Sequence, residues 1–367
     1  MRVERITYEN FRNHPVSAFE PTEGINLIHG PNGSGKTSIL EGIHYCALTR
    51  GFVSAADSDS LHFSSEYFLL NGTFIDGAGH TAAVKISYSE AREKQITVNN
   101  SELTTFSSHV GTIPCITFSP PEIVIVNGAP AERRRFLDNA ISQTDRRYLE
   151  DLMSYRRVLS QRNAQLQLLA EKRSVDDGML SIWTDTLARL AASIVRKRMI
   201  VTAALFSCFS EIFSRLKLDE IPLITYRSAF LDIGPDPSEE MLYNRYLQKF
   251  SDIQRAEILR GQTMAGPHRD DLVFMINGRE IKKFASQGQM RTFLICLKLA
   301  QQRFFFETLG ERPVCLLDDI FSELDSSRIA DIFSILETCG QAVITSADKH
   351  QYPHMTPFRI ESLKLKG

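Results

Sequence analysis

The N-terminal part of the chain alternates short apolar segments with turn signals. Strands are expected where apolar residues alternate with polar ones or form short continuous runs. These segments are residues 3–8, 25–28, 67–74, 82–88 and 95–98. Asn71-Gly72 and Asp76-Gly77 have the composition of turns. One clear helix is expected before residue 118, beginning near Ser38.

Helical spacing replaces the strand pattern after Pro130. Apolar residues recur every three or four positions from Leu149 to Leu169 and from Trp183 to Ile212, which predicts two long helices joined near residues 174–178. Helices of about 25 to 35 residues span only about 40 to 50 Å. We therefore expect a compact helical lobe and not a long coiled-coil arm.

The strand pattern returns after a break rich in proline and glycine at residues 234–237. Beyond it, helices are predicted at residues 239–259 and 290–306, and strands at residues 271–276, 314–317 and 342–345. Asn277-Gly278 is typical of a two-residue hairpin turn. The layout is that of an α/β domain interrupted by a helical insertion.

Composition narrows the class of protein. With 367 residues, 43% of them hydrophobic, and a formal net charge of −2, the chain has the composition of a soluble globular protein. This balance excludes a uniformly basic nucleic-acid coat but leaves room for one basic face. The first residues lack the apolar core of a signal peptide, and no segment is long and apolar enough to span a bilayer, so we expect a cytoplasmic protein. The six cysteines stand singly in apolar surroundings and are expected to be buried free thiols.

A glycine-rich segment between a predicted strand and a predicted helix carries the clearest chemical signal. It fits the P-loop pattern at each required position and reads Gly30, Pro31, Asn32, Gly33, Ser34, Gly35, Lys36 and Thr37. Glycines let backbone amides turn toward a phosphate, Lys36 reaches the β- and γ-phosphates, and the Thr37 hydroxyl can bind Mg²⁺. The segment predicts binding of ATP or GTP; the alternative is an ordinary glycine-rich turn from strand to helix.

Two neighbouring carboxylates follow the predicted strand at residues 314–317. An apolar strand that ends in acids places a carboxylate beside a P-loop, where it holds Mg²⁺. Asp318 is the candidate for the metal, and Asp319 can orient the attacking water. The alternative is an Asp-Asp pair that caps the turn after the strand, which we would favour only if the P-loop were absent.

Ser286-Gln287-Gly288-Gln289 precedes a predicted helix at residues 290–306. It resembles the signature motif of ABC-type ATPases, in which a serine and a helix N-terminus face a γ-phosphate. In that family the motif completes the site of a second subunit, so the resemblance implies that two chains enclose two ATP molecules. The alternative is a plain N-cap, with the Ser286 hydroxyl accepting from the amide of Gly288 or Gln289. Ser322-Glu323-Leu324-Asp325 resembles a loop found after the same motifs in ABC ATPases.

Together these motifs resemble those of the RecF family, bacterial recombination mediator ATPases related to the chromosome-maintenance and Rad50-type ABC ATPases. The resemblance covers essentially the whole chain. It also rests on Asn10 to Asn13, Pro121-Glu122, residues 128–130, Arg133 to Asp138 and Gly266 to Asp271. It implies an α/β fold, an ABC-type P-loop ATPase head with a mixed sheet and an inserted compact α-helical lobe. The head would take residues 1–130 (Walker A) and 261–367 (signature and Walker B), and the lobe residues 131–260.

The resemblance also implies a function. A member of this family is expected to bind ATP and Mg²⁺, to form a homodimer on ATP, and to bind duplex, gapped or junction DNA, with single-stranded DNA bound more weakly. With RecR and RecO it would promote RecA loading in recombinational repair and the SOS response, near the nucleoid and without membrane contact. The implied catalytic residues are Lys36, Asp319 and, in trans from the partner chain, Ser286. Thr37 and Asp318 would hold Mg²⁺, and the implied nucleotide contacts beyond the P-loop are Ser38, Arg12 and Gln289.

Departures from the broader ABC pattern predict slow hydrolysis. Ala285 and Gln287 stand where transporter motors carry leucine and glycine, and Ser346 stands where a switch histidine would follow the strand. No glutamine that links Mg²⁺ to the lid is evident near residues 116–120. Each missing contact to the transition state is worth about 2 to 4 kcal/mol, so we expect hydrolysis to time the release of the dimer.

Clustered cations in the predicted lobe suggest contacts with DNA phosphates. They are Arg133 to Arg135, Arg146-Arg147, Arg156-Arg157, Arg162, Lys172-Arg173 and Arg196 to Arg198. Such contacts give a salt-dependent affinity that is independent of sequence; the alternative for each pair is a solvated helix face. Gly266 to Asp271 is interpreted as a loop at the dimer contact or the nucleotide, with His268 alternatively a turn residue that packs locally. A transporter motor subunit and a structural chromosome-organising protein stay open as other classes, although the arginine-rich insertion argues against the first.

Overall fold

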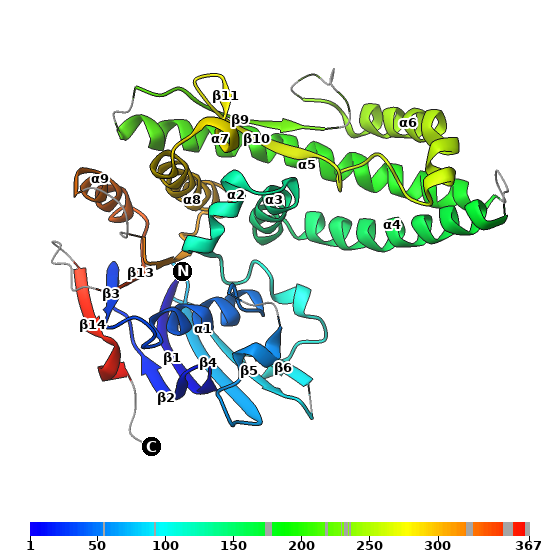
Figure 1. Cartoon of the computed structure of the whole chain (residues 1–367). Coiled ribbons are helices and arrows are strands. Elements are labelled where there is room, and N and C mark those ends of the chain that lie inside the picture. Colours follow the sequence, from blue (N-terminus) through cyan, green and yellow to red (C-terminus); the bar gives the residue numbers. More distant parts are fainter. Residues whose placement is uncertain are drawn as a thin grey trace. The chain divides into compact units, whose positions relative to one another are not determined.

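The chain forms two units, each with its own secondary structure (Figure 1). The computed structural model describes residues 1–53, 56–91, 93–172, 178–216, 219–228, 230, 234, 236–320, 326–347 and 355–363. The first unit comprises residues 1–123, 208–218 and 286–367, and the second unit comprises residues 124–207 and 219–285.

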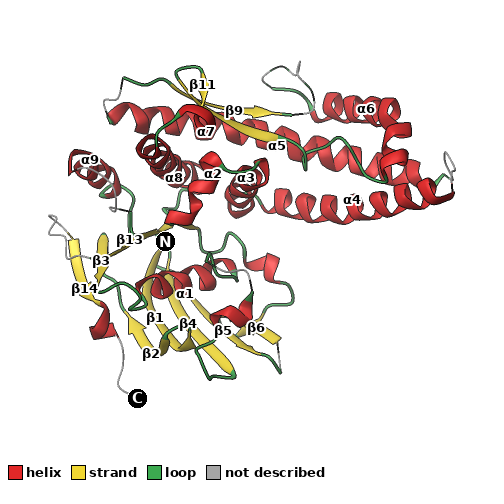
Figure 2. Cartoon of the chain, in the orientation of Figure 1, coloured by secondary structure: helices red, strands yellow, loops and turns green. Residues whose placement is uncertain are grey.

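Strands dominate the first unit and helices the second (Figure 2). The strands are β1 (Arg2–Phe11), β2 (His14–Phe19), β3 (Ile25–His29), β4 (Tyr67–Ile75), β5 (Thr81–Ser89), β6 (Glu93–Val98), β7 (Ser101–Glu102), β8 (Cys115–Phe118), β9 (Pro222–Arg227), β10 (Asp271–Ile276), β11 (Arg279–Glu280), β12 (Val314–Asp318), β13 (Ala342–Ser346) and β14 (Met355–Arg359). The helices are α1 (Lys36–Leu48), α2 (Val124–Asn127), α3 (Pro130–Thr144), α4 (Arg146–Lys172), α5 (Met179–Arg215), α6 (Glu239–Arg260), α7 (Ile281–Phe284), α8 (Gln287–Leu309) and α9 (Ser326–Leu336).

Helix α1 packs against both sheets of the first unit. One sheet is antiparallel, in the order β2-β1-β4-β5-β6-β7, and the other is parallel, in the order β14-β3-β13-β12-β8. The helix contacts β1, β4 and β5 of the first sheet and β8, β12 and β13 of the second. Its residues 39–47 are all buried, which explains why this helix lacks a polar face.

The parallel sheet brings distant segments to one edge. Thr345 of β13 pairs with Ile28 of β3 on one side and with Asp318 of β12 on the other. In both β3 and β12 the first four residues are buried, the pattern of strands covered on both faces. Because parallel strands end at the same edge, the segment after β3 and the acids after β12 lie side by side.

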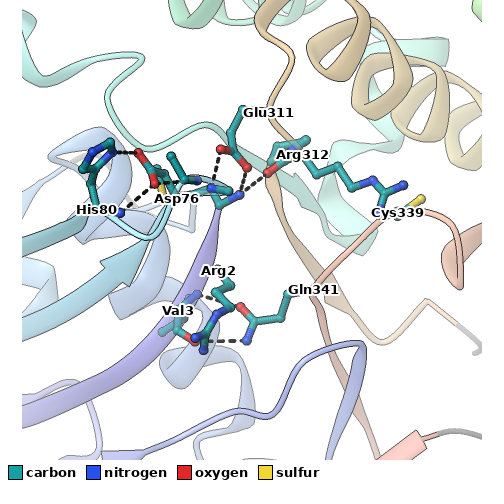
Figure 3. Close-up of polar contacts among 12 residues, drawn as sticks. Arg2, Val3, Asp76, His80, Glu311, Arg312, Cys339 and Gln341 are labelled. Carbon is teal, nitrogen blue, oxygen red and sulfur yellow. Dashed lines mark hydrogen bonds and ion pairs between the residues drawn. The ribbon is translucent and has the colours of Figure 1, made fainter.

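Polar contacts tie the first strand to the chain around β12 and β13 (Figure 3). The amide of Val3 donates to Gln341 Oε1 at 2.7 Å, and Gln341 Nε2 donates to the Val3 carbonyl at 3.0 Å. The N-terminal amine contacts the Glu311 carboxylate and donates to the Arg312 carbonyl at 2.9 Å. These bonds join the two sheets of the first unit.

The second unit combines helices with a small antiparallel sheet in the order β11-β10-β9. Helix α4 packs against α3 and α6, and α3 also packs against β10. Asn277 and Gly278 form the two-residue turn between β10 and β11, both with positive φ, as predicted.

Three of the arginines that the sequence offers as candidates for DNA contacts are buried in this unit. Arg133, Arg162 and Arg198 are 1% to 2% exposed. They form ion pairs with Asp271, Glu257 and Asp138, respectively. A buried cation without a partner is very costly, and the matching acids remove that cost. These three side chains therefore stabilise the second unit and are excluded as DNA contacts.

Other expectations are confirmed or corrected by the fold. The six cysteines are buried free thiols, as expected. Asn71-Gly72 is not a turn, because Gly72 pairs with Ile6 and Val84 inside β4. Strands β2, β7, β8, β9 and β14 were missed. In β2, Pro15 and the buried polar residue Ser17 interrupt the expected pattern. No helix among the described residues is long and apolar enough to cross a membrane.

The second predicted domain boundary differs from the structure. Residues 261–285 cluster with the second unit because β10 pairs with β9, whereas the sequence places them in the ATPase head. The division into head and lobe otherwise stays a prediction. The predicted loop Ser322 to Asp325 and most of the predicted helix joint, residues 174–177, lie outside the described residues.

Candidate nucleotide site

The glycine-rich segment of residues 30–37 leads from β3 into α1. Gly30, Gly33 and Gly35 have φ values of +156°, +76° and +104°, a region that favours glycine. A Cβ on Gly35 would lie 2.6 Å from His14 Nε2, and one on Gly30 would lie 2.4 Å from Ile360 Cγ2. Backbone conformation and close packing together fix the shape of this loop.

Lys36 folds its ammonium group over the loop that precedes it. Nζ donates to the carbonyls of Gly30 and Pro31 at 2.8 Å each. Burial lowers the pKa of Lys36, and the nearby carboxylates of Asp318 and Asp319 oppose that shift. A partly desolvated amine held by two carbonyls can exchange these contacts for phosphate oxygens, which bind a cation more strongly.

The hydroxyl of Thr37 meets the carboxylate of Asp318 across the sheet edge. Thr37 Oγ1 donates to Asp318 Oδ1 at 2.9 Å and to Oδ2 at 3.0 Å. Thr345 Oγ1 donates to Asp318 Oδ1 at 2.6 Å, and burial raises the pKa of Asp318. The structure therefore brings together the two residues predicted to hold Mg²⁺. Sequence reasoning missed Thr345, which the register of β12 and β13 places beside Asp318.

Asp319 has an unusual backbone conformation. Its φ is +48°, and its amide donates to Thr345 Oγ1 at 3.1 Å. Residues other than glycine adopt such values rarely, and aspartate is among those that do so most readily. The positive φ turns the chain sharply after β12, directly beside the predicted metal ligand.

The turn between β1 and β2 supports the glycine-rich loop from outside. Asn13 Nδ2 donates to the Gly33 carbonyl at 3.3 Å, and Ser38 Oγ donates to Asn13 Oδ1 at 3.0 Å. Arg12, with a φ of +53°, donates to Glu41 Oε1 of α1 at 2.7 Å. Arg12 and Ser38 therefore belong to the turn and the helix that flank the glycine-rich loop, and their contacts to the nucleotide stay predictions. Asn13 and Glu41 were missed as site residues.

His14 was also missed and holds the loop most directly. The ring is fully buried, with Nε2 3.0 Å from the Gly35 carbonyl and Nδ1 2.8 Å from Ser17 Oγ. Because a carbonyl can only accept, Nε2 donates to the Gly35 carbonyl. The ring thus braces Gly35, the N-cap of α1.

We expect His14→Asn to weaken ATP binding and His14→Gln to preserve it. The Gln amide nitrogen can reach the position of Nε2 and donate to Gly35, whereas the Asn side chain is too short. One net hydrogen bond is worth about 1 kcal/mol, so the Asn variant should bind ATP about 5-fold more weakly than the Gln variant. Titration with a fluorescent ATP analogue measures this, and thermal melting checks that both variants fold. Equal affinities of the two variants would contradict the role of His14.

Ser286 and Gln289 form a capping box at the start of α8. The Ser286 hydroxyl accepts from the Gln289 amide at 3.2 Å, and Gln289 Oε1 accepts from the Ser286 amide at 2.8 Å. The N-cap interpretation is therefore confirmed. A capped helix N-terminus still carries partial positive charge, so the cap is compatible with the predicted contact to a second chain's nucleotide.

Comparison with known proteins places this site in a family. A family model described as an AAA domain matches residues 5–218. The DNA replication and repair protein RecF of Chlorobium luteolum is 54% identical over 99% of this chain and 98% of its own length. The RecF protein of Chlorobaculum tepidum is 46% identical over 99% of both chains. The chain belongs to the RecF family.

Solved structures agree with the RecF assignment. The recombination mediator protein RecF with ATP, in the RecFOR pathway, superposes with a TM-score of 0.89 at 31% identity, over 98% of this chain and 95% of that protein. The Smc head bound to the C-terminal winged-helix domain of ScpA superposes with a TM-score of 0.54 at 13% identity, over 98% of this chain and 90% of that one. The second likeness concerns the fold alone. Both confirm the predicted α/β fold of an ABC ATPase head.

The residues of this RecF site fit ATP with Mg²⁺. Ser34 Oγ is buried and has no hydrogen-bond partner among the described residues, so it can bond a ligand oxygen. The Thr37 hydroxyl and the Asp318 carboxylate supply the oxygen donors that Mg²⁺ prefers. Lys36 supplies the cation that phosphates require. The individual roles of these residues stay predictions.

Proposed function

We propose that this chain is an ATP-dependent recombination mediator. It forms a homodimer on ATP, binds duplex or gapped DNA and, with RecR and RecO, promotes RecA loading in recombinational repair and the SOS response. One observation carries the proposal: the P-loop hydroxyl of Thr37 lies 2.9 Å from the carboxylate of Asp318, in a chain of the RecF family. The likeness to RecF with ATP in the RecFOR pathway supports the nucleotide and the pathway.

Each residue of the site has one task in this proposal. Lys36 exchanges its bonds to the loop carbonyls for bonds to the β- and γ-phosphates. The Ser34 hydroxyl and the backbone amides of the loop glycines donate to the phosphate oxygens. Thr37 and Asp318 hold Mg²⁺, which neutralises phosphate charge when bound. Asp319 orients the attacking water. Further contacts to the nucleotide come from Asn32, Pro31, Ser38 and Arg12.

A second copy of the chain completes the site. Its Ser286 and Gln289 stand at the N-terminus of α8, where the helix dipole favours an anion such as a γ-phosphate. Hydrolysis removes that anion, so the dimer opens and releases DNA. Asp319 is shorter than glutamate by one methylene and Ser346 stands where a switch histidine would be, which supports a weak ATPase. That this ATPase is DNA-dependent is proposed from the family resemblance.

The test is sedimentation with and without ATP·Mg²⁺, for the native chain and for Ser286→Arg. We expect the native chain to dimerise with ATP and the variant to bind ATP but remain monomeric, because the larger cation fills the space meant for the partner's phosphate. Ser238→Arg is the matched control. Ser238 is also a serine N-cap, accepting from the Met241 amide at 3.1 Å, and lies at the start of α6. Losing a cap costs about 1 kcal/mol at either helix.

Two outcomes would contradict this proposal. A native chain that stays monomeric with ATP·Mg²⁺ would exclude the ATP-dependent dimer. A Ser286→Arg variant that dimerises as the Ser238→Arg variant does would exclude the role of Ser286 in trans.

A further inference from the structure

The loop of residues 266–271 connects three helices of the second unit. Arg198 of α5 donates from Nη1 to the Pro267 carbonyl at 2.7 Å, and Arg134 of α3 donates from Nη1 to the Asp270 carbonyl at 2.7 Å. Tyr155 of α4 contacts His268 Nδ1 through its hydroxyl at 2.6 Å. The loop is therefore held rigidly at the point where these helices meet.

The acids around this loop face the interior. Asp138, Asp270 and Asp271 are 6%, 1% and 5% exposed. Asp271 accepts from Arg133 at 2.8 and 3.0 Å, Asp138 accepts from Arg198 at 2.7 Å, and Asp270 accepts from the Tyr226 hydroxyl. Asp271 also forms an ion pair with the exposed Arg227 at 3.5 Å, so its charge acts on two guanidinium groups.

Two other arginines near this loop, Arg156 and Arg269, are exposed to solvent, and Arg134 is half-buried. The side chain of Arg156 is 67% exposed and comes no closer than 3.9 Å to Asp138. Arg269 is exposed, and its Nε donates to a backbone carbonyl, that of Thr263, at 3.3 Å. Half-buried Arg134 likewise bonds a backbone carbonyl. In the described part of the chain, neither Arg134 nor Arg269 lies within 4.0 Å of a carboxylate oxygen.

The charged residues around the loop of residues 266–271, called the arginine cluster below, therefore carry surplus positive charge. The arginine cluster contains more arginines than acids: Arg133, Arg134, Arg156, Arg198, Arg227 and Arg269 against Asp138, Asp270 and Asp271. Burial lowers the pKa of His268 to about 4, so its ring adds no charge at neutral pH. The inner ion pairs take up Asp138 and Asp271, Asp270 accepts from the Tyr226 hydroxyl, and the exposed guanidinium groups of Arg156 and Arg269 remain for a partner.

We propose that Arg156 and Arg269, backed by Arg134, bind the phosphate backbone of duplex DNA. This inference rests on the proposed function and adds the residues that perform it. A guanidinium group donates two parallel bonds to phosphate oxygens, and such contacts position a protein on DNA without reading its sequence. In the loop of residues 266–271, Asp270 and Asp271 then hold the loop against the unit, and Arg269 binds the DNA.

The test compares two double variants of the full chain in the presence of ATP·Mg²⁺. Arg156→Gln/Arg269→Gln removes the proposed contacts. Arg189→Gln/Arg303→Gln is the control, because it removes the same charge from an exposed and a half-buried arginine that already pair with Asp185 and with Glu211 and Glu307. Binding of a labelled blunt duplex is measured over a range of KCl concentrations, and sedimentation confirms that both variants still dimerise.

We expect the first variant to bind the duplex about 10-fold more weakly at low salt and to lower the slope of log K against log[KCl] by about 1.8, since each lost phosphate contact accounts for about 0.9. The control should match the native chain. An unchanged slope would overturn the proposal, as would full DNA binding combined with lost binding of RecR or RecO, which would assign the surface to a protein partner. A native chain that binds no duplex would overturn the proposed function itself.

Discussion

Replacing Lys36 by methionine is expected to abolish ATP binding and ATP-dependent dimerisation together. The ammonium group lies 2.8 Å from the carbonyls of Gly30 and Pro31 and is the cation of the loop. Methionine keeps the apolar stem but cannot donate to phosphate oxygens. Losing two charge-assisted bonds of about 1.5 to 3 kcal/mol each weakens binding at least about 100-fold. Titration with a fluorescent ATP analogue and sedimentation with ATP·Mg²⁺ measure the two effects.

The matched control for this variant is Lys85→Met. Lys85 is an exposed lysine in β5 of the same unit, so the substitution removes the same charge without touching the loop. It should bind ATP and dimerise as the native chain does. If Lys36→Met failed to bind ATP but still dimerised, nucleotide binding and dimer formation would be uncoupled, and the proposed ATP-dependent dimer would be wrong.

The parts of this site that sequence predicts are those encoded locally. The glycine-rich loop needs specific residue types at fixed spacing, because only glycine tolerates its backbone and close packing. The strand of residues 314–318 is recognised by its apolar run and its terminal acids. Both patterns lie within a few consecutive residues, so they can be recognised without knowledge of the fold.

The missed residues of the site depend on pairing between distant segments. Thr345 contacts Asp318 only because β12 and β13 pair in one register. His14 lies in the sequence as one polar residue in a proline-containing strand, and nothing nearby indicates that its ring reaches Gly35. Such contacts follow from tertiary structure, which the local pattern does not contain.

The arginine clusters show the same limit for charges. Sequence treats each arginine as a surface cation because its acidic partner is far along the chain. Arg133 and Asp271 are separated by 138 positions, Arg162 and Glu257 by 95, and Arg198 and Asp138 by 60. Folding turns these three residues into internal ion pairs and leaves their neighbours at the surface, so a single run of cations contains both structural and ligand-binding members.

Replacing Arg162 by methionine is expected to destabilise the second unit strongly. Its Nη2 lies 2.5 Å from Glu257 Oε2, and Nη1 donates to Thr263 Oγ1 at 2.8 Å. The side chains of Arg162 and Glu257 are 1% and 0% exposed. Removing one partner of a buried pair costs about 3 to 5 kcal/mol, because the other charge is left without compensation. Calorimetry should show that the transition temperature of this unit falls by about 10 °C. Added ATP·Mg²⁺ should raise the transition temperature of the first unit, which holds the nucleotide site, and so identifies which transition belongs to which unit.

Two further variants show whether the uncompensated charge is the cause. Arg162→Met/Glu257→Gln removes both charges and should recover most of the lost stability, while the Gln can still accept from the Met264 amide, which lies 2.7 Å from Glu257 Oε1. Arg189→Met breaks the exposed pair with Asp185 and should leave the transition temperature almost unchanged, because solvent screens an exposed pair. If the double variant were as unstable as Arg162→Met, the loss would come from packing of the long side chain against Phe250, whose ring lies 4.7 Å from the guanidinium carbon, and not from the buried acid.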